Sequence, residues 1–163
     1  MARREVRPYE ILAITFTNKA AGEMKERVTE LVGPVAKSMW VSTFHSSCVR
    51  MLRQEVERLG YSSTFSIYDS ADSQKLISRV METLNLDSKR YPARQFQHLI
   101  SNAKNELQTP YEYLSKATNQ FETIVADVYT MYEKRLQQAN AMDFDDLIMK
   151  TVQVLQKHPE AKA

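Results

Sequence analysis

The sequence predicts an α/β protein in which helix predominates. Two strand-then-helix patterns fill residues 11–60, and nearly every periodic segment beyond residue 69 is helical. A β-α-β-α order implies parallel strands joined by right-handed crossovers. We therefore expect an α/β domain at residues 1–69 and a helical subdomain at residues 70–163.

The first strand is expected at residues 11–16, where a short apolar run is typical of a buried parallel strand. A helix should follow it, because apolar residues then recur at spacings of three and four: Ala21, Met24, Val28 and Leu31. Gly33 and Pro34 are expected to end this helix.

The pattern then repeats. The segment "MWVSTF", residues 39–44, predicts a second strand, and a second helix should end at Gly60. Its apolar positions are Val49, Leu52, Val56 and Leu59. A third short strand is expected at "FSIYD", residues 65–69.

Four later segments show the helical period, at about residues 76–84, 96–107, 121–136 and 147–155. The second of them follows Pro92. No repeat, low-complexity tract or flexible linker separates these segments. The second half of the chain is therefore expected to form a helical bundle. Aromatic residues at such helical spacing are more often core residues than platforms for bases, and they are left unassigned here.

Composition limits the function. The chain has 22 basic and 20 acidic residues, so its net charge of +2 gives no overall signature of nucleic-acid binding, and any such site must be local. Cys48 is the only cysteine, the start of the chain has no apolar signal segment, and no apolar run is long enough to span a membrane. We expect a reducing, cytoplasmic setting. With three glycines and no G-x-x-x-x-G-K-[ST] motif, the chain has no nucleotide cradle of its own.

Polar residues beside an aromatic follow both early strands: "TFTNK" at residues 15–19 and "STFHS" at residues 42–46. Ligands of open α/β sheets bind outside the carboxyl ends of the strands, where these turns should lie side by side. A helix N-terminus with nearby hydroxyl, amide or basic groups favours a phosphate. Two such sites suggest a strand of nucleic acid, with Phe16 or Phe44 stacking on a base.

A structural alternative stands beside this one. Asn18 and Ser46 are residue types that often act only as N-caps, and both phenylalanines could belong to the core. No zinc site is expected at His45, because Cys48 is the only thiol and the other histidines lie far along the chain.

The acidic segment "DFDDL", residues 143–147, also has two interpretations. Its carboxylates suit Mg²⁺. The spacing favours a structural role instead, with Asp143 as an N-cap and Asp146 three residues later completing a capping box.

The ordered motifs resemble those of a known family. "ILAITFTNKAAGEMKERV" is similar to motif Ia of the superfamily 1 DNA helicases of the UvrD/PcrA/Rep type, and "VSTFHSSCVRMLR" resembles the motif that follows it. "ISNAKNEL", "VYTMYEKRLQQANAMDFDDLI" and "LQKHPE" resemble, in the same order, the helical insertion of these enzymes. The resemblance covers nearly the whole chain from about Val6.

The resemblance implies a motor of two RecA-like domains that hydrolyses ATP with Mg²⁺ and moves 3′-to-5′ on single-stranded DNA, in repair or replication. This chain would be a truncated RecA-like (P-loop NTPase) sheet plus the helical insertion. Its implied partners are single-stranded DNA, a duplex junction and the rest of the helicase chain. The implied DNA contacts are Phe16, Thr17, Asn18, Lys19, Thr43, Phe44, His45 and Ser46.

Two parts of the family pattern are not found. The Walker A lysine would be expected before Met1 and the Walker B acidic segment after Ala163. We therefore predict no catalytic residue, bound cofactor or metal in this chain, no ATPase activity of the chain alone, and self-association through exposed sheet edges. The alternatives are the helicase region of a RecB/AddA-type helicase-nuclease and a non-catalytic interaction module.

Overall fold

The computed structural model describes residues 6–162, and the chain divides into two compact units, residues 1–51 and 52–163. The structure is mostly helical with small parallel sheets, as the sequence predicts. The boundary between the units falls inside one helix. The division at residue 69 expected from the sequence stays a prediction.

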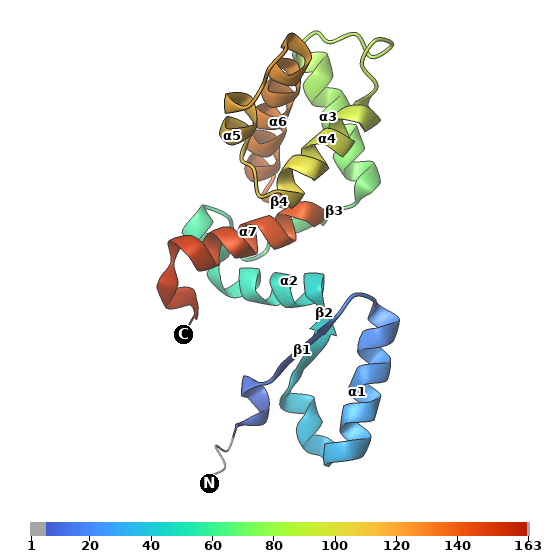
Figure 1. Ribbon diagram of the computed structural model, residues 1–163, viewed down its shortest axis with the longest axis vertical. Coiled ribbons are helices and arrows are strands. Elements are labelled where there is room, and N and C mark those ends of the chain that lie inside the picture. The colour runs from blue at the N-terminus through green and yellow to red at the C-terminus, as the bar shows by residue number, and fades with distance from the viewer. Residues whose placement is uncertain (1–5, 163) are drawn as a thin grey trace. The chain divides into compact units, whose positions relative to one another are not determined.

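The first unit contains one parallel strand pair and one covering helix (Figure 1). Its elements are η1 (Pro8–Glu10), β1 (Leu12–Thr15), α1 (Asn18–Val32), η2 (Gly33–Ser38), β2 (Trp40–Thr43) and the first part of α2 (Phe44–Glu55). Leu12 lies opposite Trp40, and Thr15 lies opposite Thr43. Both strands therefore end at the same edge of the sheet.

Helix α1 packs on this strand pair through one face only. Along β1, Ala13 and Thr15 are half-buried, while Leu12 and Ile14 between them are exposed. The prediction of a buried first strand is therefore wrong for the described residues. The alternation follows from the pleat, which points successive side chains to opposite faces, of which α1 covers one.

Glycines end the two early helices where the sequence predicts. Gly33 has φ 74° after α1. Helix α2 continues through η3 (Val56–Leu59) to Gly60, which is left-handed at φ 79°. A side chain at Gly60 would be strained by this φ, and its Cβ would come within 3.3 Å of Gln137 Nε2.

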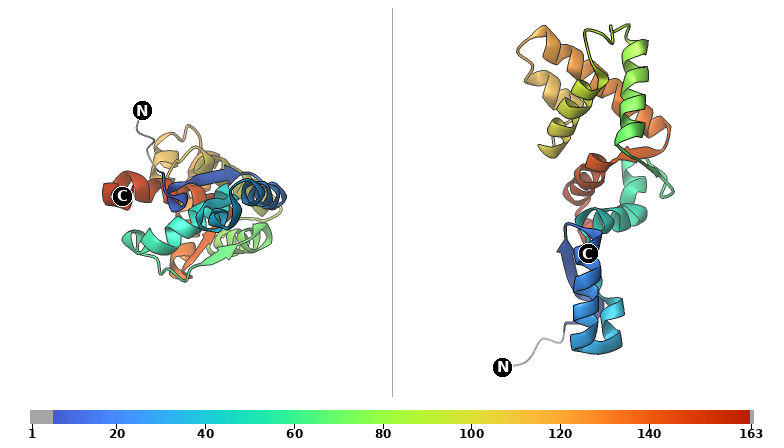
Figure 2. Two further views of the ribbon diagram at one scale, coloured as in Figure 1. Left: turned by 90° about the horizontal axis from the view of Figure 1, so that it is seen from below. Right: turned by 90° about the vertical axis from the view of Figure 1, so that its right-hand side faces the viewer.

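In the second unit, three helices form the bundle that the sequence predicts. Helices α3, α4 and α6 pack against one another (Figure 1 and Figure 2). The elements after η3 are β3 (Ser66–Tyr68), α3 (Ser70–Thr83), α4 (Ala93–Asn105), α5 (Pro110–Ser115), α6 (Gln120–Gln138), β4 (Ala141–Asp143), α7 (Phe144–Lys157) and η4 (Pro159–Lys162).

A second parallel pair, β3 with β4, joins distant parts of this unit, and Tyr68 lies opposite Asp143. The predicted third strand therefore exists, but it pairs with β4, which the sequence does not reveal. Asn140, at φ 46°, turns the chain from α6 into β4. Its side-chain Oδ1 accepts from Ser62 N at 2.8 Å, and its carbonyl accepts from Ser66 N at 2.9 Å.

The core of the second unit lies between α3, α4 and α6. The buried cluster comprises Ile77, Val80, Met81, Phe96, Ile100, Ala103, Val125, Val128, Tyr129, Tyr132, Leu136 and Ala141. Of the aromatic residues left unassigned from the sequence, Phe96, Tyr129 and Tyr132 lie in the core, whereas Tyr111 on α5 is exposed. Within residues 6–162, no helix combines the length and the apolar character that a membrane crossing requires.

Candidate nucleic-acid interface

The two polar turns of the first unit lie side by side. Because β1 and β2 are parallel and Thr15 lies opposite Thr43, the residues that follow each strand leave the sheet at the same edge. The adjacency expected from the sequence is therefore present. This edge carries both candidate groups, residues 15–19 and residues 42–46.

In the first turn, Phe16 projects into solvent with 89% of its surface exposed. Thr17 is the N-cap of α1, and its Oγ1 accepts from Ala20 N at 3.1 Å. Asn18 is the first helical residue, so the suggestion that Asn18 is the cap is wrong by one position. The Asn18 side chain is exposed beside Phe16.

Lys19 belongs to the same exposed turn. It contacts Glu23 at 3.9 Å between two exposed side chains, a pair that holds its ammonium only weakly. An ammonium in this state can exchange the carboxylate for an anionic ligand with little loss.

The second turn is held more tightly by hydroxyl groups. Thr43 is buried, and its Oγ1 lies 2.8 Å from Ser46 Oγ and accepts from Ser46 N at 3.3 Å. Ser42 Oγ lies 2.7 Å from Ser47 Oγ. Thr43 therefore does the capping that the structural alternative gave to Ser46. Phe44 begins α2 with 43% of its surface exposed.

This arrangement presents groups of the kinds that contact phosphates and bases. Ala20 N donates to Thr17 Oγ1, which leaves the N–H groups of Asn18 and Lys19 at the positive end of the helix dipole for an anion. Neither Phe16 nor Phe44 is a core residue, which contradicts the structural alternative for both. Each exposed ring offers a face on which a base can stack.

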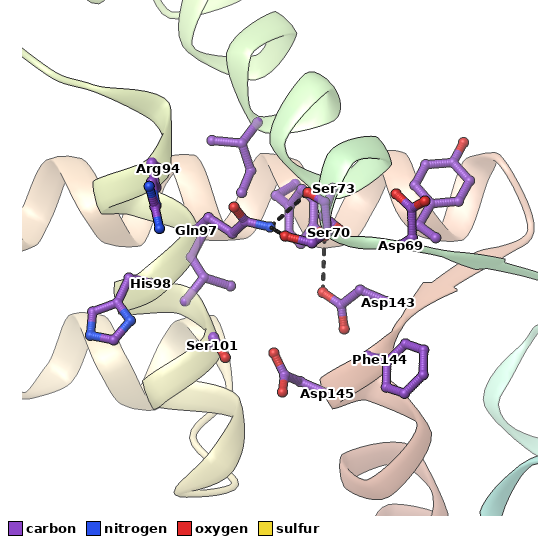
Figure 3. Close-up of a pocket in the computed structure, with 14 residues that line it drawn as sticks. Asp69, Ser70, Ser73, Arg94, Gln97, His98, Ser101, Asp143, Phe144 and Asp145 are labelled. Atoms are coloured by element: carbon purple, nitrogen blue, oxygen red, sulfur yellow. Dashed lines mark hydrogen bonds between the residues drawn. The ribbon is translucent and has the colours of Figure 1, made fainter. Parts of the chain in front are cut away.

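A hollow of about 500 Å³ in the second unit was not foreseen from the sequence. Arg94, His98 and Ser101 lie along one face of α4 and face Asp143 and Asp145 at the start of α7 (Figure 3). The available signal was the spacing of 94, 98 and 101, which places these polar residues on one helix face. The hollow combines donors on one wall with carboxylates on the other.

The acidic segment at the start of α7 forms the expected capping box. Asp143 Oδ1 accepts from Asp146 N at 2.9 Å, and Asp146 Oδ2 accepts from Asp143 N at 3.2 Å. The structural interpretation of "DFDDL" is therefore confirmed for these two residues. Among residues 6–162, no group of three or more histidine, cysteine or acidic side chains is arranged to hold a metal ion.

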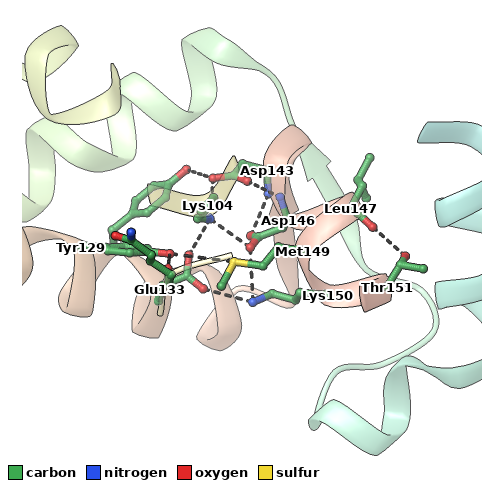
Figure 4. A network of polar contacts seen from close by, with 11 residues as sticks. Lys104, Tyr129, Glu133, Asp143, Asp146, Leu147, Met149, Lys150 and Thr151 are labelled. Carbon is green, nitrogen blue, oxygen red and sulfur yellow. Dashed lines mark hydrogen bonds and ion pairs between the residues drawn. The ribbon is translucent and has the colours of Figure 1, made fainter. Parts of the chain in front are cut away.

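The same carboxylates form a buried ion cluster with two lysines, defined here as Lys104, Glu133, Asp143, Asp146 and Lys150 (Figure 4). Lys104 Nζ lies 2.6 Å from Glu133 Oε1, 2.7 Å from Asp143 Oδ2 and 3.0 Å from Asp146 Oδ1. Lys150 Nζ lies 3.1 Å from Glu133 Oε2 and 3.3 Å from Asp146 Oδ1. The cluster ties α4, α6 and α7 together.

Burial and charge act against each other on the pKa values of this ion cluster. Burial raises the pKa of Asp143, and Lys104 only partly offsets it. Burial also acts to raise the pKa of Asp146, but Lys104 and Lys150 together outweigh burial and lower it. For Lys104, burial favours the neutral amine, yet three carboxylates overcome that effect and raise its pKa. Both lysines therefore remain charged inside the protein.

The chain thus has a parallel strand pair that presents two polar turns, and a helical unit follows it. Its motifs stand in the order of a helicase, which defines the class of protein. All of residues 1–163 match the family described as UvrD/REP helicase N-terminal domain, and the chain belongs to that family.

Individual members show how close the relationship is. The chain is 48% identical over 160 residues to the ATP-dependent DNA helicase PcrA of Bacillus subtilis (strain 168), an alignment that covers 98% of this chain. It is 48% identical over 157 residues to the proteins of the same name from Staphylococcus aureus (strain Mu50) and Staphylococcus epidermidis, covering 96% of this chain. The chain spans 22% of the length of each of these relatives.

Proposed function

We propose that this chain is the single-stranded-DNA-contacting part of an ATP-dependent 3′-to-5′ DNA helicase acting in repair or replication. Its sheet is then a truncated RecA-like sheet, and ATP and Mg²⁺ belong to the whole enzyme. The proposal includes a reducing, cytoplasmic setting. Its partners are a duplex junction and the remaining helicase chain, and copies of the chain self-associate through exposed sheet edges. The names of the relatives favour this function over a non-catalytic module.

The observation that carries the proposal is the placement of two exposed aromatic rings beside two capped helix starts at one sheet edge. Phe16 and Phe44 supply stacking faces that do not depend on base identity. The N–H groups of α1 and the side chains of Asn18 and Lys19 supply phosphate contacts. Sequence-indifferent binding of a single strand follows from this combination.

Fluorescence anisotropy with a dye-labelled oligothymidine tests the proposed interface. Replacing Phe16 and Asn18 by alanine together should weaken binding about tenfold or more, because stacking contributes about 1 to 3 kcal/mol per base. Adding His45→Ala to this double variant should weaken oligonucleotide binding further. The logarithm of affinity should fall with the logarithm of salt at a slope of about −0.7 for each phosphate contacted.

The matched control replaces an exposed aromatic and an exposed amide elsewhere, Tyr111→Ala with Asn105→Ala. This control should bind like the parent chain. If the Phe16 and Asn18 variant bound as tightly as this control, the two turns would not be the DNA site.

A further inference from the structure

A second hollow, of about 360 Å³, lies between α6, α7 and the end of η3 in the second unit. Three lysines from two helices line it: Lys134 on α6, and Lys150 and Lys157 on α7. Two amide side chains, Gln137 and Gln153, line it as well. We refer to these five residues as the lysine hollow, which is separate from the turns of the first unit in sequence.

Two lysines of this hollow, Lys134 and Lys157, are exposed. In the described chain, neither Lys134 nor Lys157 makes an ion pair. Several other basic residues of the chain do, such as Arg58 with Glu55 and Glu160. The ammonium groups of Lys134 and Lys157 are therefore available to an anion from solution.

The one carboxylate that lines the hollow is already neutralised. The two oxygens of Glu133 lie 2.6 Å from Lys104 Nζ and 3.1 Å from Lys150 Nζ. Lys150 is 7% exposed and stays charged: burial acts against its ammonium, but Asp146 and Glu133 outweigh burial and raise its pKa. Glu133 and Asp146 balance the charge of Lys150, so the net positive charge of the lining comes from Lys134 and Lys157.

The floor of the hollow is fixed in position. The buried ion cluster holds Lys150 from within, and the Tyr61 side chain, 7% exposed, lies with its ring centroid 5.4 Å from Lys150 Nζ. The hollow thus combines one cation held by the ion cluster, two exposed cations and two amide donors. Lysine ammonium groups act as compact point charges, which suits a phosphate group.

We propose that the lysine hollow is a phosphate-binding site, with Lys134, Lys157 and the two glutamine amides as direct contacts. Two sources carry this chemistry: the backbone of a nucleic acid, and a free phosphate or pyrophosphate. The site does not depend on the function proposed above, because none of its residues belongs to the two turns.

Amide chemical-shift mapping of the full 163-residue chain tests this site. Inorganic pyrophosphate is one probe. Oligothymidine is the other probe. It is added to the double variant Phe16→Ala with Asn18→Ala, so that binding at the two turns does not dominate the chemical-shift changes. Shifts that concentrate at residues 133–137 and 150–157 are expected with at least one probe. A response to pyrophosphate alone identifies a free anion as the ligand, and a response to the oligonucleotide identifies a nucleic-acid backbone.

Variants distinguish binding at the lysine hollow from a general effect of lost positive charge. Lys134→Ala with Lys157→Ala should weaken binding about tenfold, the loss expected when charge-assisted contacts are removed. The matched control, Lys75→Ala with Lys116→Ala, removes the same charge from exposed positions on other elements and should change the affinity less than about twofold. Equal weakening by both pairs, or no concentration of shifts at the hollow with either probe, would overturn the proposal.

Discussion

Lys104 is 1% exposed, and its ammonium is shared by three carboxylates. Such a group is costly to bury, and its net contribution to stability depends on the partners that surround it. Asp143 is held further by Tyr132, whose hydroxyl donates to Asp143 Oδ2 at 2.9 Å. Removing the lysine would leave Lys150 as the only cation of the cluster for the buried Asp143 and Asp146 and the half-buried Glu133.

We predict that Lys104→Met lowers the free energy of unfolding by about 3 to 5 kcal/mol, the range found when one partner of a buried ion pair is removed. Urea unfolding followed by circular dichroism measures this. The exposed control Lys75→Met should change stability by less than about 0.5 kcal/mol. Adding Asp143→Asn to Lys104→Met should recover part of the loss, because it removes one uncompensated charge. A loss below about 1 kcal/mol in the single variant would contradict the role assigned to this ion cluster.

At the scale of the elements, the start of α1 holds a capping residue, Thr17, next to Asn18, which we propose contacts DNA. Thr17 Oγ1 accepts from Ala20 N, whereas Asn18 makes no capping contact in the described structure. Thr17→Ala should therefore lower stability by about 1 kcal/mol, and Asn18→Ala should leave it nearly unchanged.

Thermal unfolding of both variants, set beside their oligonucleotide affinities, checks this assignment. The expected pattern is that Asn18→Ala affects DNA binding and not stability. A destabilised Asn18→Ala variant would show that the amide acts in the fold.

The sequence predicts the long elements and the adjacency of the two turns, because hydrophobic period and parallel pairing are local or topological properties. It does not predict β4 or α5, which are too short for a period to show. It also misplaces the caps, because threonine, serine and asparagine all cap helices and the helix start decides which one does. The buried ion cluster depends on contacts between Lys104 and residues far along the chain, which no spacing reveals.

For the molecule as a whole, stability should fall at alkaline pH. Carboxylates outweigh burial to raise the pKa of Lys104 and Lys150 above 10.5. Burial raises the pKa of Tyr129 and Tyr132 above 10.0. Because these groups keep their protons in the folded chain, their stabilisation is complete below the unfolded pKa values and is lost as pH rises beyond them.

We therefore expect the free energy of unfolding to decrease from about pH 10 upward, by up to about 1.4 kcal/mol per pH unit for each group. Urea unfolding between pH 8 and about pH 11.5 measures the slope. Tyr132→Phe should flatten it, while the exposed control Tyr111→Phe should not. A stability that stays constant across this range would contradict the raised pKa values.

Exposed apolar side chains on the first unit predict association between copies. Leu12 and Ile14 lie on the uncovered face of β1, and Leu31 and Val32 are exposed at the end of α1. Open strand edges and apolar faces favour pairing with another chain. Light scattering after size exclusion should show mass increasing with concentration, and Ile14→Lys should reduce this increase. A strict monomer at every concentration would contradict the prediction.

The pairing of β3 with β4 has a consequence for how this protein can change over evolution. Because β3 and β4 pair in parallel, the chain leaves this strand pair after Tyr68 and returns to it at Ala141, which lies opposite Ser66. Everything between is an excursion that begins and ends within one short strand pair. Such a segment can be lengthened, shortened or exchanged for another without rerouting the chain on either side, provided that its replacement restores a cation where Lys104 meets the start of α7.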